Sequence, residues 1–155
     1  MSSAPTSAAL TVLLVEDSDD DAFFFQRATR QKASLRVIRA RDGEEAKHYL
    51  SGTGPYSDRA QHPLPDAVLT DLKMPLCTGT ELVSWMRSQP DHAQTPCVIV
   101  SSSNVQSDME AARVAGATAY LVKPSTLAGY EHLWDAFRKV CAHVSAFSVT
   151  LPQER

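Results

Sequence analysis

Five polar side chains follow directly on short apolar stretches of the chain, and their types suit one kind of chemistry. Glu16 and Asp17 come after TVLLV, and Asp71 comes after DAVLT. Ser101 ends the stretch CVIVS, and Lys123 follows AYLV. Carboxylates are the ligands that Mg²⁺ prefers, and a lysine with a hydroxyl can bind phosphoryl oxygens. The set indicates a divalent cation and the transfer of a phosphoryl group to a carboxylate.

These side chains can meet if the apolar stretches are neighbouring parallel strands. Apolar runs alternate with amphipathic stretches along the chain, which predicts an α/β fold with a doubly wound, five-stranded parallel sheet and five helices on its two faces. The carboxyl ends of such strands share one edge, where sites lie. The expected strands are 11–15, 35–40, 66–70, 97–102 and 119–122. One helix is expected to begin at Ser18, and four more are expected at 43–52, 79–88, 107–116 and 127–147.

The length of 155 residues fits one domain with a sizeable core. We expect a flexible leader at 1–9, the folded domain at 10–147 and a C-terminal tail at 148–155, with no DNA-binding output domain. Residues 53–65 contain glycine, serine and three prolines and predict a long loop.

Composition excludes several classes of protein. A net charge of −3 argues against nucleic-acid binding, and no apolar run reaches the roughly 18 residues that a membrane span needs. The cysteines Cys77, Cys97 and Cys141 form no CxxC pair, which argues against zinc and fits a reducing cytoplasm. We expect Cys97 and Cys141 to pack in the core and the five histidines to lie on the surface.

The segment VEDSDDDAFFF crowds five carboxylates into six residues, from Glu16 to Asp21. Glu16 and Asp17 end a strand and are the metal candidates. Residues 19–21 fall in the first turn of a helix, where the helix dipole favours negative charge, and Ser18 with Asp21 resembles a capping box. Phenylalanines 24 and 25 are expected to face the sheet, while Phe23 points outward and is a candidate partner contact.

Five motifs, taken in order, resemble the receiver domains of two-component response regulators. The resemblance covers about residues 10–147 and implies a flavodoxin-like fold with strand order 2-1-3-4-5. It also implies a phosphoacceptor with self-catalysed phosphotransfer and autodephosphorylation rather than an enzyme acting on a separate substrate. The motifs are VED at 15–17, DLKMP at 71–75, Ser101 in VSSS, GA at 116–117 and YLVKP at 120–124.

The resemblance assigns roles to the acids. Asp71 would accept a phosphoryl group from a sensor histidine kinase. Asp17 would bind Mg²⁺ directly, Glu16 would bind it through water, and Asp71 and the backbone carbonyl of Lys73 would complete the protein ligands.

The same resemblance assigns roles around the phosphoryl group. Ser101 and Lys123 would hold its oxygens, and Tyr120 would turn inward when Ser101 moves toward it. This would remodel the face made by the fourth helix, fifth strand and fifth helix for partner binding or dimerisation. The peptide between Lys123 and Pro124 is often cis in this family.

A narrower resemblance points to the small response regulators paired with bacterial phytochromes. It rests on the long loop at 53–65, on Trp85 and on the hydroxyls of VSSS. Ser18 and Asp19 stand where those proteins often carry Asn-Pro, which is a departure. The partners implied are a phytochrome-type histidine kinase and a second copy of the chain, bound through the long apolar stripe of the last helix.

Three alternatives compete with this interpretation. A phosphatase of the haloacid-dehalogenase type would use Asp17-Ser18-Asp19, but it needs an acidic motif on a later strand and leaves Asp71 without a role. A calcium loop starting at Asp17 fails, because alanines 22 and 28 stand where glycine and glutamate are required. A degenerate receiver would bind partners without phosphotransfer.

Overall fold

A single parallel sheet organises the chain in the computed structural model, which describes residues 9–30, 32, 34–143 and 146–152. The strand order is β2-β1-β3-β4-β5-β6, and every neighbouring pair is parallel. The predicted order of the first five strands is confirmed. The strands are β1 Leu10–Val15, β2 Leu35–Ala40, β3 Ala67–Asp71, β4 Cys97–Ser101, β5 Ala119–Val122 and β6 Ser148–Thr150.

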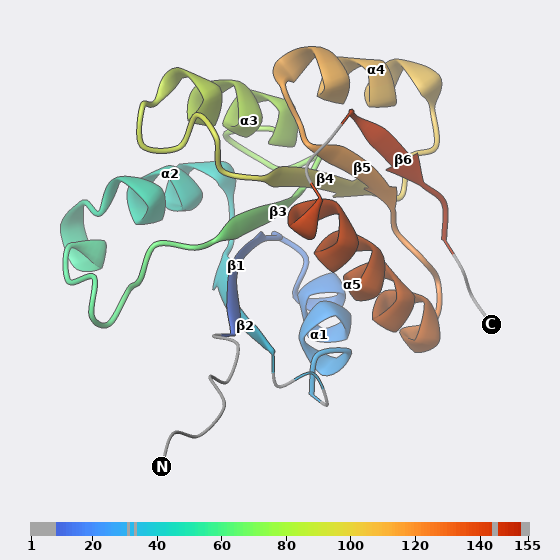
Figure 1. The fold of residues 1–155 in the computed structure, drawn as a ribbon, viewed down its shortest axis with the longest axis horizontal. Helices are drawn as coiled ribbons and strands as arrows, with labels where there is room; N and C mark the ends of the chain where they lie inside the picture. Colours follow the sequence, from blue (N-terminus) through green and yellow to red (C-terminus); the bar gives the residue numbers. More distant parts are fainter. Residues whose placement is uncertain (1–8, 31, 33, 144–145, 153–155) are drawn as a thin grey trace.

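Helices cover both faces of the sheet, as Figure 1 shows. Helices α1 and α5 pack on one face, and α2, α3 and α4 pack on the other. The doubly wound arrangement is therefore confirmed. Within the described residues, none of the helices is long and apolar enough to cross a membrane. The helices are α1 Asp19–Arg27, α2 Gly43–Ser51, α3 Gly79–Ser88, α4 Gln106–Ala115 and α5 Leu127–Ala142, with a 3₁₀ turn η1 at Gly54–Tyr56.

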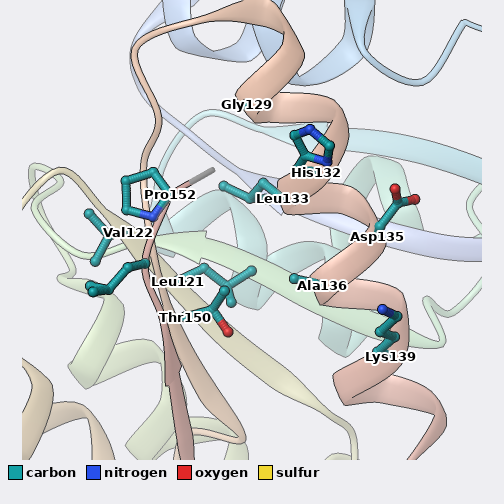
Figure 2. Close-up of a pocket in the computed structure, with 11 residues that line it drawn as sticks. Leu121, Val122, Gly129, His132, Leu133, Asp135, Ala136, Lys139, Thr150 and Pro152 are labelled. Atoms are coloured by element: carbon teal, nitrogen blue, oxygen red, sulfur yellow. The ribbon is translucent and has the colours of Figure 1, made fainter. Parts of the chain in front are cut away.

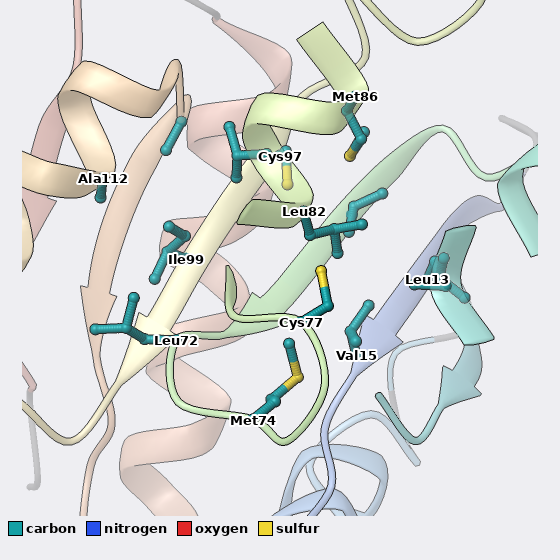
Figure 3. Close-up of a cluster of buried hydrophobic side chains, with 14 of the residues drawn as sticks. Leu13, Val15, Leu72, Met74, Cys77, Leu82, Met86, Cys97, Ile99 and Ala112 are labelled. Carbon is teal, nitrogen blue, oxygen red and sulfur yellow. The ribbon is translucent and has the colours of Figure 1, made fainter. Parts of the chain in front are cut away.

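Two cores form because alternate residues of a strand point to opposite faces. In β1, Leu13 and Val15 enter the core beneath α2, α3 and α4, whereas Val12 and Leu14 enter the core beneath α1 and α5. Figure 3 shows Leu13 and Val15 with other members of the first core, among them Leu82 from α3. The β1 strand is thus apolar on both faces, as its unbroken apolar sequence predicted.

The sheet has six strands in the described residues, so the prediction of five and of a tail at 148–155 was wrong in part. Ser148–Thr150 pairs in parallel with residues 119–121 of β5. The physical reason is that β5 alone would leave an edge of unpaired backbone groups. A three-residue strand carries too little periodicity to be recognised. The pocket of about 310 Å³ shown in Figure 2 includes residues of α5 and Thr150 of β6.

The last helix ends at Ala142, not at 147 as its apolar stripe predicted. Phe147 packs instead against the core on the opposite face of the sheet. The chain leaves the α5 face here to reach the outer edge of β5, which breaks the helical spacing of the stripe. Residue 144 of the stripe lies outside the described residues, as do residues 1–8 of the expected leader.

Three side-chain predictions also need correction. Phe25 is buried, but Phe24 is 40% exposed and stacks on Tyr130 of α5 rather than on the sheet. His92 is buried and its Nε2 lies 3.0 Å from the carbonyl oxygen of Leu50, so not all histidines lie on the surface. Cys77 is buried, whereas Cys141 is only partly so; Cys97 is buried as predicted.

Helices α1 and α5 are joined by a buried hydrogen bond. The indole Nε1–H of Trp134 donates to the carbonyl oxygen of Phe25 at 2.8 Å. Phe25 lies in the last turn of α1, where carbonyls lack helical partners. The tryptophan therefore caps α1 from α5 and fixes the helix that begins at the end of β1.

We expect Trp134→Phe to lower the free energy of unfolding by about 1–3 kcal/mol, because the Phe25 carbonyl would stay buried without a donor. Urea titration measures this loss. Trp85→Phe is the matched control, since Trp85 is half-buried and stacks on His92. Equal losses in the two variants would contradict a special role for the indole hydrogen bond.

Candidate functional site

The carboxyl ends of four neighbouring strands bring the predicted site residues to one edge of the sheet. Asp71 pairs with Val100 in the strand register, and Ser101 pairs with Val122. The N–H of Lys123 donates to the carbonyl oxygen of Ser101 at 2.8 Å, which extends the ladder by one residue. Residues more than 100 positions apart in the chain thus become neighbours.

Glu16, Asp17 and Asp71 form a compact acidic cluster. Each offers a carboxylate oxygen, and these oxygens lie within 4.8 Å of one another. Glu16 is fully buried and Asp71 is 9% exposed, while Asp17 is exposed. The cluster is therefore buried at Glu16 and Asp71 and open to solvent at Asp17.

Glu16 is the most deeply buried acid in this cluster. Its Oε1 lies 2.8 Å from Lys123 Nζ as an ion pair, yet within the described residues it has no hydrogen bond of good geometry. Burial and the charge of Asp71 raise the pKa of Glu16 to about 7, against the attraction of Lys123. Three converging carboxylates with an unsatisfied buried oxygen are the donor set that a hard divalent cation fits.

Lys123 supplies the positive charge of the site. Its Nζ lies 2.7 Å from Asp21 Oδ2, 2.8 Å from Glu16 Oε1 and 3.2 Å from Asp71 Oδ2. Burial alone would lower the pKa of Lys123, but the charge of Asp71 and the contacts with Asp21 and Glu16 outweigh it and raise that pKa. The side chain is 8% exposed, so the ammonium is held in a fixed place.

Asp71 is bound through both carboxylate oxygens. Oδ1 accepts from the N–H of Leu72 at 2.7 Å, and Oδ2 accepts from Lys123. The start of α3 approaches this strand end so closely that a Cβ on Gly79 would lie 2.4 Å from the Asp71 carbonyl oxygen. Only glycine permits this approach. The side chain of Lys73 is exposed, and its carbonyl as a metal ligand stays a prediction.

Ser101 and Tyr120 meet at Ser103 rather than at Asp71. Ser101 Oγ accepts from the N–H of Ser103 at 3.1 Å, and the hydroxyl of Tyr120 donates to the carbonyl oxygen of Ser103 at 2.8 Å. Ser103 Oγ in turn donates to Asp108 Oδ2 at 2.5 Å. Tyr120 is fully buried. The ring thus lies in the inward position.

The peptide between Lys123 and Pro124 is trans, since the described residues contain no cis peptide bond. The cis form that the resemblance suggested is therefore not the one in this structure. The lysine is positioned by its three acidic partners.

Asp21 belongs to the site, which the sequence did not reveal. Ser18 caps α1 as predicted, accepting from the N–H of Asp21 at 3.2 Å, but the N–H of Ser18 donates to Glu16 Oε2 instead of to Asp21. The Asp21 carboxylate points to Lys123. One signal was present: helical side chains lean toward the helix N-terminus, and α1 begins at this edge of the sheet.

The position of Asp19 argues against the phosphatase and the calcium-loop alternatives. Its Oδ1 pairs with Arg39 at 2.8 Å and with Arg41 at 3.0 Å, and its side chain is 75% exposed. Arg39 also donates to the carbonyl oxygen of Glu16 and so ties β2 to the end of β1. The aspartates of a phosphatase D-x-D or a calcium loop would have to converge, whereas Asp17, Asp19 and Asp21 face different partners.

Comparisons with known proteins agree with this geometry. The model of the response regulator receiver domain matches residues 12–132. The two-component response regulator ARR15 of Arabidopsis thaliana is 33% identical over 84% of this chain, which spans 64% of the length of ARR15. Response regulator Rcp1 of Synechocystis is 30% identical, with 91% of this chain and 92% of Rcp1 covered.

Solved structures point the same way. The phosphorylated cyanobacterial phytochrome response regulator RcpA has a TM-score of 0.78 at 26% identity, covering 90% of this chain and 98% of RcpA. RPA3017, a response regulator in red light signalling of R. palustris, has the same TM-score and identity, covering 94% of this chain and 99% of its own. The Mn²⁺-bound form of Rcp1 has a TM-score of 0.67 at 28% identity, covering 85% of this chain and 89% of the Rcp1 chain. The chain is thus similar to response regulators of phytochrome and red light signalling, and it belongs to the response regulator receiver domain family.

Proposed function

We propose that this protein is a phosphorylation switch in which Asp71 is the phosphoacceptor. The observation that carries the proposal is the contact of Asp71 Oδ2 with Lys123 Nζ at 3.2 Å inside an acidic, partly open cluster. In the reaction, an Asp71 oxygen forms a bond to phosphorus while the P–N bond of a kinase phosphohistidine breaks, and the histidine nitrogen takes the electron pair. Lys123 and Ser101 then bind the phosphoryl oxygens.

The acidic cluster would hold Mg²⁺. Glu16, Asp17, Asp71 and the carbonyl of Lys73 would be the protein groups around it, and the fit rests on the converging oxygens and the unsatisfied Glu16 Oε1. The ion would supply charge neutralisation for the incoming phosphoryl group. The Mn²⁺-bound structure of Rcp1 supports this assignment by similarity.

The signal would leave through the β4–α4 loop and Tyr120. A phosphoryl group on Asp71 would attract the Ser101 hydroxyl, which now accepts from Ser103. Tyr120 lies inward with its hydroxyl bonded to Ser103, and phosphorylation would stabilise this arrangement. The face of α4, β5 and α5 would present that state to a partner.

The proposed donor is a sensor histidine kinase of phytochrome type, acting in the cytoplasm. The relatives whose names mention phytochrome or red light support this partner, and three free cysteines fit the compartment. Phe23 of α1, which is 56% exposed, is the proposed contact with the kinase. A homodimer through the last helix stays a prediction with weaker support, because the stripe that suggested it is buried against the sheet.

The decisive test of phosphotransfer is incubation with Mg²⁺ and acetyl phosphate, followed by mass spectrometry. We expect one phosphoryl group, located on Asp71, and none after Asp71→Asn or in EDTA. Hydroxylamine should release it, since an acyl phosphate is cleaved by that nucleophile. Label that survives Asp71→Asn would reject the assignment, and absence of label in the wild type would favour a degenerate receiver that only binds partners.

The switch proposal predicts that Asp108 holds the β4–α4 loop. Asp108→Ala removes the acceptor of Ser103 Oγ, so amide hydrogen exchange at Ser103 and Val105 should become at least about fivefold faster. Exchange measured by mass spectrometry or NMR checks this. Glu110→Ala, on the exposed side of the same helix, is the control and should leave the loop unchanged. Similar exchange in both variants would contradict the role of Asp108.

The homodimer is tested by light scattering, with and without beryllofluoride as a phosphoryl analogue. We expect a dimer mass in at least the analogue-bound state if the output is dimerisation. A monomer mass in both states would reject the dimer and leave partner binding as the output.

A further inference from the structure

The ammonium of Lys123 is shared by three acids, and its nearest one does not come from a strand end. Asp21 of α1 lies 2.7 Å from Nζ, closer than Glu16 at 2.8 Å and Asp71 at 3.2 Å. An ammonium has three N–H donors. Two of the donors of Lys123 make hydrogen bonds to Asp21 and Asp71, and Glu16 lies against the ammonium as an ion pair.

A phosphoryl group on Asp71 would change this balance. It turns the Asp71 carboxylate into an acyl phosphate, whose oxygens take over the Asp71 contact with Lys123. A phosphoryl group can accept from more than one donor of the ammonium, but only if Glu16 or Asp21 gives up its contact. Glu16 is fully buried and cannot exchange the ammonium for water without leaving a buried charge unpaired. The Asp21 side chain is 34% exposed, so water can replace its lysine contact. Of Glu16 and Asp21, Asp21 is therefore the acid able to yield its contact.

We propose that Asp21 is a positioning residue that holds Lys123 on the α1 side of the site and thereby limits how readily Asp71 takes and keeps a phosphoryl group. The inference rests on the proposed function of Asp71. Asp21 acts against phosphorylation in two ways: it competes for the ammonium, and its own charge repels the incoming anion. The neighbouring acids of the same turn do not do this, since Asp19 pairs with Arg39 and Arg41.

The chain offers a matched control in Asp20, which lies in the same first turn of α1 and is exposed. Asp21→Asn and Asp20→Asn each remove one negative charge from that turn. Any effect of net charge or of the helix dipole is therefore common to both variants. Asp21→Glu keeps the charge and serves as the conservative variant.

The experiment measures beryllofluoride affinity with Mg²⁺, by intrinsic fluorescence or NMR, and the rate of Asp71 labelling by acetyl phosphate. In labelling, the Asp71 O–P bond forms, the P–O bond to acetate breaks, and acetate leaves with the electron pair. We expect Asp21→Asn to bind beryllofluoride about three to ten times more tightly than Asp20→Asn and to label correspondingly faster. Asp21→Glu should stay within about twofold of the wild type.

A double-mutant cycle separates positioning from a merely structural role. With Lys123→Met as the background, Asp21→Asn should lose its advantage over Asp20→Asn, because the competition is for the ammonium. Equal affinities of the two asparagine variants in the wild-type background would overturn the inference, as would weaker binding in Asp21→Asn. In those cases labelling of Asp71 in the wild type would leave the proposed function standing, whereas no labelling at all would overturn both.

Discussion

The repulsion among carboxylates at the ends of β1 and β3 is the constraint on which the rest of the structure depends. Three acids offer oxygens within 4.8 Å of one another, and two of them are buried. Like charges at such distances repel one another strongly in a partly dry site, and a nearby cation offsets that repulsion. Lys123 is one such cation, since its Nζ contacts both Glu16 and Asp71. The apolar strands are what keep these acids in place, since both faces of β1 and β3 are packed in the two cores.

Residues whose roles follow from strand ends could be predicted from the sequence. Parallel strands bring their carboxyl ends to one edge whatever the intervening chain does, so Glu16, Asp71, Ser101 and Lys123 could be grouped without knowing any contact. Helix limits with local signals were also predictable. Gly52 ends α2 in the left-handed conformation, and Thr78 with Glu81 forms a capping box at α3. Such signals involve residues that are close together in the chain, so they can be recognised from the sequence alone.

Other features depend on contacts between residues far apart in the chain, and no local sequence signal predicts them. The Asp21 carboxylate meets Lys123 across 102 positions, and the Trp134 indole meets Phe25 across 109. Phe24 turns to Tyr130 because α5 crosses α1 there, which helical periodicity alone cannot show. Tyr120 is a similar case, because its hydroxyl bonds to Ser103 in the loop after β4, which the sequence around Tyr120 does not specify.

The sixth strand alters what a partner would meet at the switching face. In a five-stranded receiver the free edge of the sheet would be β5, the strand that carries Tyr120. Here β6 pairs along that edge, with Val149 opposite Tyr120 in the register. A shift of Tyr120 that moves the β5 backbone must move β6 as well, because the ladder hydrogen bonds join them. Val149 is 40% exposed, so the outer side of β6 lies at the surface. The outer edge of the sheet is therefore β6 rather than β5, and residues 148–150 belong to the sheet rather than to a tail.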